Sequence, residues 1–146
     1  MSGRNLMRGE SLPAEYWVIE MGIREPFNDQ NRMILTRIEA RHGEPRIYTW
    51  KAKAETVDND AWIFDTEADA NTAARHWHKG CEVKYRDRVF TTAEALEEIG
   101  ISHPTFMKIV KEMEITGAGS GIGSGKLYRG RDIARIRREW RGRWKK

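Results

Sequence analysis

Apolar and β-branched residues cluster in three short segments in the first third of the chain, and polar turns separate them. The segments cover residues 16–23, 33–40 and 46–52, and the turns between them contain Pro, Asn, Asp or Gly. Such segments predict β-strands, and strands joined by four or five turn residues are typical of hairpins. A further short strand is expected over 62–64, and residues 81–85 form either a last strand or a linker.

One helix is expected between these last two segments. Thr66 is a suitable N-cap, and Asp69 follows three positions later in a weak capping-box pattern. The apolar face repeats at i, i+3, i+4 and i+7, through Ala70, Ala73, Ala74 and Trp77. The helix is expected to end at Gly80, with this face packed on the sheet.

Helical periodicity replaces strand-like patterning in the second half of the chain. Thr91 and Glu94 have the spacing of a capping box, and Gly100 stands where a positive φ ends a short helix. Ser102 is the expected N-cap of a second helix, with Pro104 in its first turn. The core-facing positions of the second helix are Phe106, Ile109, Val110 and Met113.

A glycine-rich segment and a basic helix follow. Residues 115–116 and 126–129 are expected to form two strands, with residues 117–125, which carry no large side chain except Ile122, at the tip between them. Asp132 is expected to start the last helix, whose apolar stripe is Ile133, Ile136, Trp140 and Trp144. The stripe packs on the core or on a second subunit; the alternatives are a helix end that is disordered in isolation, or stacking of Trp on nucleic-acid bases.

These segments together resemble a known DNA-binding family. The run T-A-E-A-L-E-E-I-G-I-S-H-P-T-F, followed by K-L-Y-R-G-R-D-I, is similar to the MerR-like and excisionase-like winged helix-turn-helix domains of phages, plasmids and their hosts. The resemblance covers about residues 88–140 and implies DNA binding. In this fold type the second helix enters a DNA groove.

The expected fold is therefore α+β with two domains. Residues 1–14 are a flexible lead, and residues 15–85 form a small antiparallel sheet with one helix. Residues 86–146 form a winged helix-turn-helix domain that ends in an Arg/Trp-rich basic helix.

Charge is distributed unevenly between the two halves. Residues 84–146 hold 15 Lys and Arg against 8 Asp and Glu, whereas residues 1–83 hold 11 against 14. A solvated basic tail gives such a count, but the asymmetry also fits a C-terminal half that meets a polyanion.

Composition also bears on location. The single cysteine, Cys81, excludes an internal disulfide and fits a reducing cytosol. No apolar run approaches the about 20 residues of a membrane span, and the first ten residues lack a secretory signal pattern. A cytoplasmic protein without membrane contact is expected.

Specific positions are expected to contact DNA. His103 and Thr105 are candidates for base edges, because a recognition helix contacts bases from its first turns. Lys108 and Lys111 are candidates for phosphate, and Lys126 with exposed N–H groups of the glycine-rich tip is expected to approach the backbone. The full set of candidates is Thr92, Ser102, His103, Thr105, Lys108, Lys111, Ser124, Lys126, Arg129, Arg131, Arg135 and Arg138.

Other chemistries fit the sequence poorly. A Walker A motif would place Gly at Ser120 and Ser or Thr at Leu127. His76, His78 and Cys81 lie close in sequence, but two positions on a helix point apart and a fourth zinc ligand is not evident. No nucleophile, base and acid occur together, so we expect no enzyme activity, no catalytic residues, no metal and no cofactor.

The leading hypothesis is a sequence-selective duplex DNA-binding protein of phage or mobile-element type, acting as a regulator, an excisionase-like protein or a packaging factor. A homo-oligomer or a protein partner would use residues 15–85 or the apolar stripe of the last helix. One alternative is a protein-binding effector, an inhibitor or adaptor, that acts through residues 15–85, with the C-terminal domain only localising it or regulating its expression. Another is a C-terminal domain that binds only protein.

Overall fold

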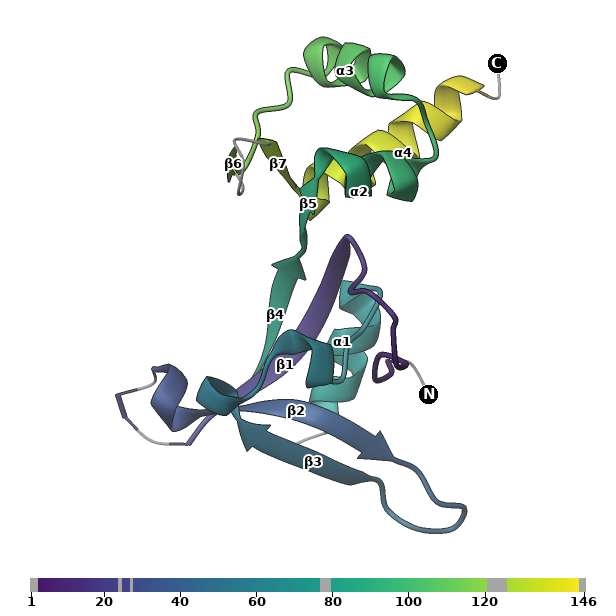
Figure 1. Ribbon diagram of the computed structural model, residues 1–146. Helices are drawn as coiled ribbons and strands as arrows, with labels where there is room; N and C mark the ends of the chain where they lie inside the picture. The colour runs from purple at the N-terminus through teal and green to yellow at the C-terminus, as the bar shows by residue number, and fades with distance from the viewer. Residues whose placement is uncertain (1–2, 24, 27, 77–79, 121–125, 145–146) are drawn as a thin grey trace. The chain divides into compact units, whose positions relative to one another are not determined.

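The computed structural model describes residues 3–23, 25–26, 28–76, 80–120 and 126–144, with the side chains of 29, 119–120 and 141–144 left out of this description. The chain is α+β: the described residues contain a four-stranded antiparallel sheet, a three-stranded sheet and four α-helices (Figure 1). It divides into two compact units. The first unit comprises Met1–Leu12 with Tyr16–Arg86, and the second comprises Pro13–Glu15 with Asp87–Lys146.

The first unit is built on the four-stranded sheet. Its strands are β1 (Glu15–Gly22), β2 (Arg32–Glu39), β3 (Ile47–Ala52) and β4 (Cys81–Asp87), in the order β3-β2-β1-β4. The three N-terminal strands lie within one residue of their predicted ranges. The segment over 81–85, for which the sequence left two alternatives, is a strand.

Helix α1 (Glu67–Arg75) belongs to the same unit. The Thr66 hydroxyl accepts a hydrogen bond from the Asp69 N–H at 3.2 Å, as predicted. Ala70 and Ala73 are buried against Phe64 and other apolar residues of the sheet. The helix ends at Arg75 rather than near Gly80, and Trp77 lies outside the described residues.

Residues 3–12, which the sequence placed in a flexible lead over 1–14, form part of the first unit. Arg4 and Ile63 exchange two backbone hydrogen bonds, of 2.9 and 2.8 Å. The Asn5 side chain donates to the Thr36 carbonyl at 2.6 Å, and Leu6 and Leu12 pack on the core. The strand predicted over 62–64 is likewise corrected, because Ile63 and Phe64 form isolated bridges instead.

A buried carboxylate links the elements of the first unit. Glu20 on β1 has a side chain that is 1% exposed, and it contacts three cations. Its Oε1 lies 3.0 Å from Arg32 Nε, and its Oε2 lies 3.2 Å from Lys53 Nζ and also binds Arg86. Arg86 also lies 3.6 Å from Asp58, so one acidic centre connects β1, β2, β4 and the turns after β3.

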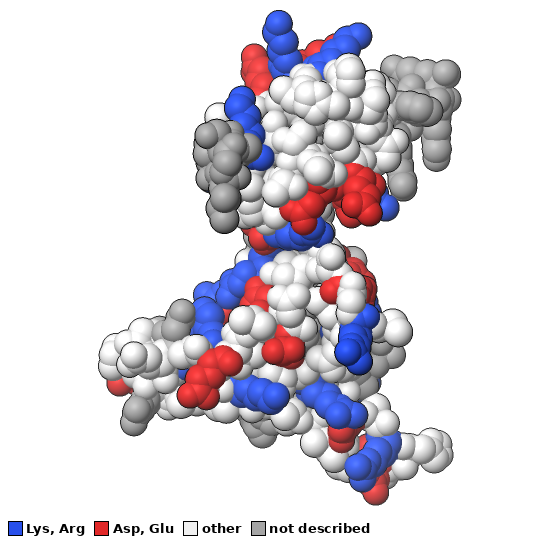
Figure 2. Space-filling model, viewed as in Figure 1, with Lys and Arg blue, Asp and Glu red and all other residues white. Residues whose placement is uncertain are grey.

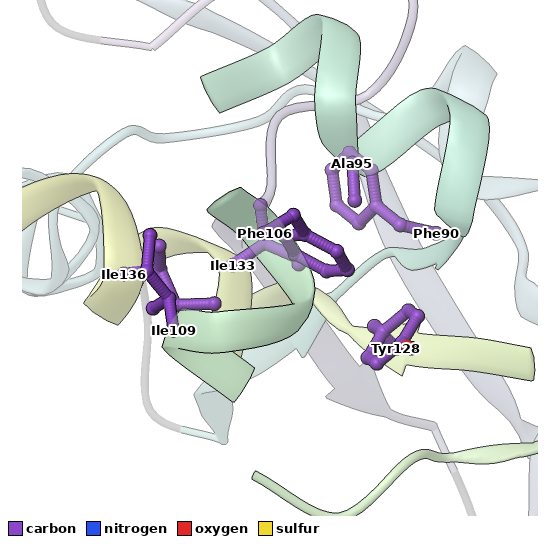
Figure 3. Close-up of a cluster of buried hydrophobic side chains, with 7 residues drawn as sticks. All are labelled: Phe90, Ala95, Phe106, Ile109, Tyr128, Ile133 and Ile136. Carbon is purple, nitrogen blue, oxygen red and sulfur yellow. The ribbon is translucent and has the colours of Figure 1, made fainter. Parts of the chain in front are cut away.

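The second unit combines three helices with the three-stranded sheet. Strand β5 (Val89–Thr91) leads into α2 (Thr92–Ile99) and α3 (His103–Glu112), and β6 (Gly119–Ser120) and β7 (Lys126–Arg129) precede α4 (Gly130–Trp144). The sheet order is β5-β7-β6. Figure 3 shows the core on which these elements converge, made of Phe90, Ala95, Phe106, Ile109, Tyr128, Ile133 and Ile136.

Local capping signals determine the ends of α2. Thr91 and Glu94 form the predicted capping box, in which each side chain accepts a hydrogen bond from the other residue's N–H. Gly100 has φ 79° and ends the helix, as its position predicts. Ser102 is the N-cap residue of α3, as predicted, but its side chain makes no capping hydrogen bond to a backbone N–H. Its hydroxyl instead shares a 2.9 Å hydrogen bond with the Thr105 hydroxyl.

The strands before α4 differ from the prediction. Residues 115–116 are not a strand; Gly119 and Ser120 pair instead with Leu127 and Lys126. β7 also pairs with β5, a partner that the sequence pattern does not show. Helix α4 begins at Gly130, two residues before the expected start at Asp132. The five residues 121–125 of the expected tip lie outside the described part.

Candidate nucleic-acid interface

Helix α3 has one anchored face and one exposed face. Phe106 and Ile109 are buried in the core, and the Phe106 ring meets the Tyr128 ring edge-on at a centroid distance of 5.1 Å. These contacts fix the rotation of the helix about its axis. The exposed face carries Ser102, His103, Lys108 and Lys111, with Thr105 half-buried beside them.

Four of the predicted positions on α3 are therefore exposed to solvent, and five of the seven candidate cations have no acidic partner among the described residues. Within the described part of the chain, no ion pair involves the side chains of Lys108, Lys111, Lys126, Arg129 or Arg131. A cation without an ion-pair partner can bind a phosphate without first breaking an existing contact.

Three other arginines of α4, all within the described side chains, are already paired. Arg135 lies 3.2 Å from Glu139, and Arg138 lies 3.3 Å from Glu15. Arg137, which was not among the candidates, lies 2.9 Å from Glu98. These pairs are at the surface, where an ion pair contributes about 0–1 kcal/mol, so an incoming anion can replace the carboxylate at small cost.

Two other candidates are placed differently. Thr92 is the first residue of α2 and is half-buried. Ser124 lies in the segment that the structure does not describe. On the face of the second unit that Figure 2 shows, Lys and Arg side chains lie beside Asp and Glu side chains, so this face is mixed in sign.

Glu94, near the start of α2, makes its contacts with neighbouring residues of the protein and stabilises the start of the helix. The hydrogen bond from the Thr91 N–H and the ion pair with Arg88 hold the pKa of Glu94 below its usual value, against the opposing effect of burial. Arg88 also lies over the Phe90 ring at 4.2 Å. This group therefore stabilises the joint between β5 and α2.

The structure also identifies candidate surface residues that the sequence pattern did not indicate. Thr116 and Gly117 follow α3 and lie beside Arg129, Arg131 and Arg135 around one surface hollow. Their short side chains carry no periodic signal, and only the turn after α3 brings them near the arginines. Met107, with 37% of its surface exposed, is the one large apolar side chain that α3 presents to solvent among the described residues.

No group of three or more His, Cys, Asp or Glu side chains among the described residues is arranged to hold a metal ion. His76 is exposed, His78 lies outside the description, and burial raises the pKa of the Cys81 thiol. Among the helices described, none combines the length and the apolar character that crossing a bilayer demands.

Comparison of the chain with family models, curated proteins and solved structures yields no match.

Proposed function

We propose that the second unit docks on duplex DNA as a winged helix-turn-helix module, with α3 in the major groove. The observation that carries the proposal is the two-sided character of α3: an apolar face anchored by Phe106 and Ile109, and an exposed face that presents His103, Lys108 and Lys111. The ten residues of α3 span about 15 Å, and a helix fits the major groove, which is about 12 Å wide.

Each exposed group has a chemistry that suits this role. His103 and Thr105 lie in the first turn of α3, where side chains of a recognition helix contact base edges. Histidine and threonine both donate and accept hydrogen bonds, so either matches several base edges. Lys108 and Lys111 lie further along the helix and match phosphates as point charges.

Strand β7 and helix α4 carry further candidates for contact with the DNA backbone. Lys126 begins β7, and Arg129 and Arg131 stand on either side of the point where β7 passes into α4. A single unit of this size contacts few base pairs, so sequence selectivity calls for a second copy bound nearby. The proposed role is that of a phage- or mobile-element-type regulator, excisionase-like protein or packaging factor in the cytoplasm.

The test is a fluorescence-anisotropy titration of the full chain with random-sequence duplex DNA at several salt concentrations. Affinity should fall steeply with salt, since each phosphate contact contributes about −0.9 to the slope of log K against log salt. The double variant Lys108→Gln/Lys111→Gln should bind more weakly and lower the magnitude of that slope by about two.

Lys51→Gln is the matched control. Lys51 is exposed on β3 of the first unit, and within the described residues it makes no ion pair. The control should bind DNA as the parent does, with both variants checked for folding by far-UV circular dichroism. Absence of DNA binding at low salt, or equal effects of the α3 variant and the control, would overturn the proposal.

A further inference from the structure

A surface hollow of about 340 Å³ lies in the second unit, between the turn after α3 and the start of α4. One wall is the backbone and side chains of residues 114–117. The other wall is the end of β7 and the first two turns of α4, which supply Arg129, Arg131, Asp132 and Arg135.

Three guanidinium groups line this one hollow. Arg131 and Arg135 are four residues apart on α4, so they lie on the same side of the helix. Arg129 ends the strand that runs into that helix. A guanidinium presents N–H groups in a planar fork that matches the oxygens of a phosphate, and several of them around one hollow favour an anion strongly.

The opposite wall adds hydrogen-bond donors. Within the described residues, the N–H groups of Thr116 and Gly117 and the Thr116 hydroxyl have no hydrogen-bond partner, whereas the neighbouring N–H groups of Ile115 and Ala118 donate to Val110 and Leu127 at 3.0 and 2.6 Å. Backbone N–H groups and hydroxyls are common phosphate ligands at nucleic-acid interfaces. The hollow therefore offers donors from both walls.

Two carboxylates also line the hollow and oppose anion binding. Asp132 is in the first turn of α4, and Glu114 lies in the turn that follows α3. Glu114 has φ 54°, the left-handed region that glycine or asparagine adopts more easily. The arginines outnumber the carboxylates by one, so an anion is attracted, and removal of the Glu114 charge should strengthen the attraction.

We propose that this hollow seats one backbone phosphate of bound DNA. The inference rests on the proposed function and makes it specific: Arg129, Arg131 and Arg135 clamp the phosphate from one side, and Thr116 and Gly117 bind it from the other. Arg135 exchanges its surface contact with Glu139 for the phosphate. The contact is independent of sequence and sets the position of α3 along the duplex.

The first test probes the hollow without DNA. The 15N-labelled full chain is titrated with inorganic phosphate at constant ionic strength, with sodium chloride as the compensating salt. Saturable shifts are expected at the amides of Thr116, Gly117 and Arg131. They should be lost in Arg131→Gln/Arg135→Gln and kept in Arg137→Gln, which removes a cation from the same helix but outside the hollow. Shifts scattered over all basic residues would overturn the proposal.

The second test uses duplex DNA. Arg131→Gln should weaken binding several-fold and lower the magnitude of the salt slope by about one, whereas Arg137→Gln should leave the slope unchanged. Glu114→Gln should tighten binding several-fold, an effect that unfolding cannot produce. Its control is Glu97→Gln, which removes an exposed carboxylate of α2 that does not line the hollow.

The outcomes separate the two proposals. If inorganic phosphate shifted the amide signals of the hollow but the protein did not bind DNA, the hollow would be a site for free phosphate. That result would overturn both the proposal that a DNA phosphate occupies the hollow and the proposed function. The phosphate seat would be overturned if Arg131→Gln weakened DNA binding no more than Arg137→Gln and Glu114→Gln did not tighten it. If Lys108→Gln/Lys111→Gln still weakened DNA binding in that case, the proposed function would stand.

Discussion

Replacing Glu20 by glutamine tests whether a buried charge holds the first unit together. The substitution keeps the size and one hydrogen-bond acceptor but removes the charge that Arg32, Lys53 and Arg86 share. Removing one partner of a buried ion pair costs about 3–5 kcal/mol, because the remaining charges stay desolvated without compensation.

The lower end of that range applies here. Arg32 keeps a contact with Glu82 at 3.1 Å, and Arg86 keeps one with Asp58 at 3.6 Å, so neither cation is left alone. We expect Glu20→Gln to lower the free energy of unfolding by about 3 kcal/mol. With an m-value of about 1–2 kcal/mol/M in urea, the midpoint should fall by about 1.5–3 M.

The assay must separate the two units, so urea unfolding is followed by amide hydrogen exchange in β1 and β2 for the first unit and in α2 and α3 for the second. Glu82→Gln is the control, because it removes a carboxylate that contacts the same Arg32 but is 49% exposed. It should cost at most about 1 kcal/mol. A loss for Glu20→Gln that is no larger than this, or an equal loss in both units, would refute the argument.

Three further predictions concern the second unit. Gly130→Ala should destabilise this unit by about 1–3 kcal/mol, because the added Cβ would lie 1.9 Å from the Ala14 carbonyl oxygen. Thermal unfolding measures this loss, and an unchanged Tm would contradict the close approach. Phe106→Ala should cost about 3–5 kcal/mol, measured in the same way, because a fully buried ring is removed from the core. Glu94 has a lowered pKa, so its stabilising effect is complete above about pH 5 and is lost as the pH falls through that lowered pKa. Glu94→Gln should therefore flatten the fall of Tm between about pH 5 and pH 3, and a variant with the parent's pH profile would show that Glu94 is not the group responsible.

Local signals in the sequence predict the elements, because they depend on residues a few positions apart. The Thr91 and Glu94 spacing and the conformational freedom of Gly100 define α2 without any tertiary contact. The i, i+3, i+4, i+7 pattern that starts at Phe106 correctly gives the buried face of α3. Because this pattern defines the buried face, it also predicts which residues of α3 lie on the opposite, exposed face.

The errors of the sequence-based prediction arise where a partner is distant in the chain. The segment 3–12 has no periodicity, and its order comes from contacts with residues such as Ile63, about 60 positions later. β5 pairs with β7 across two intervening helices. The hollow beside Arg131 is of the same kind, because it exists only when the turn at 114–117 meets the start of α4.

The number of Lys and Arg residues in a segment does not by itself locate the proposed binding surface, because many of these cations contact carboxylates of the same protein. The basic excess of residues 84–146 includes Lys84, Arg86 and Arg88, yet each of these contacts a carboxylate, of Glu82, Glu20 and Glu94 respectively. Such cations are already neutralised by the protein and contribute little to the attraction of a polyanion.

Within residues 84–146, the cations whose described side chains have no ion-pair partner instead lie on α3 and around the junction of β7 with α4. They are Lys108, Lys111, Lys126, Arg129 and Arg131. If the second unit binds DNA as proposed, the salt dependence of binding should therefore follow this smaller set, and variants of the paired residues Lys84 and Arg86 should leave the slope unchanged. If Lys84→Gln lowered the slope as much as Lys111→Gln, net charge alone would govern the interaction and the geometry of α3 would not.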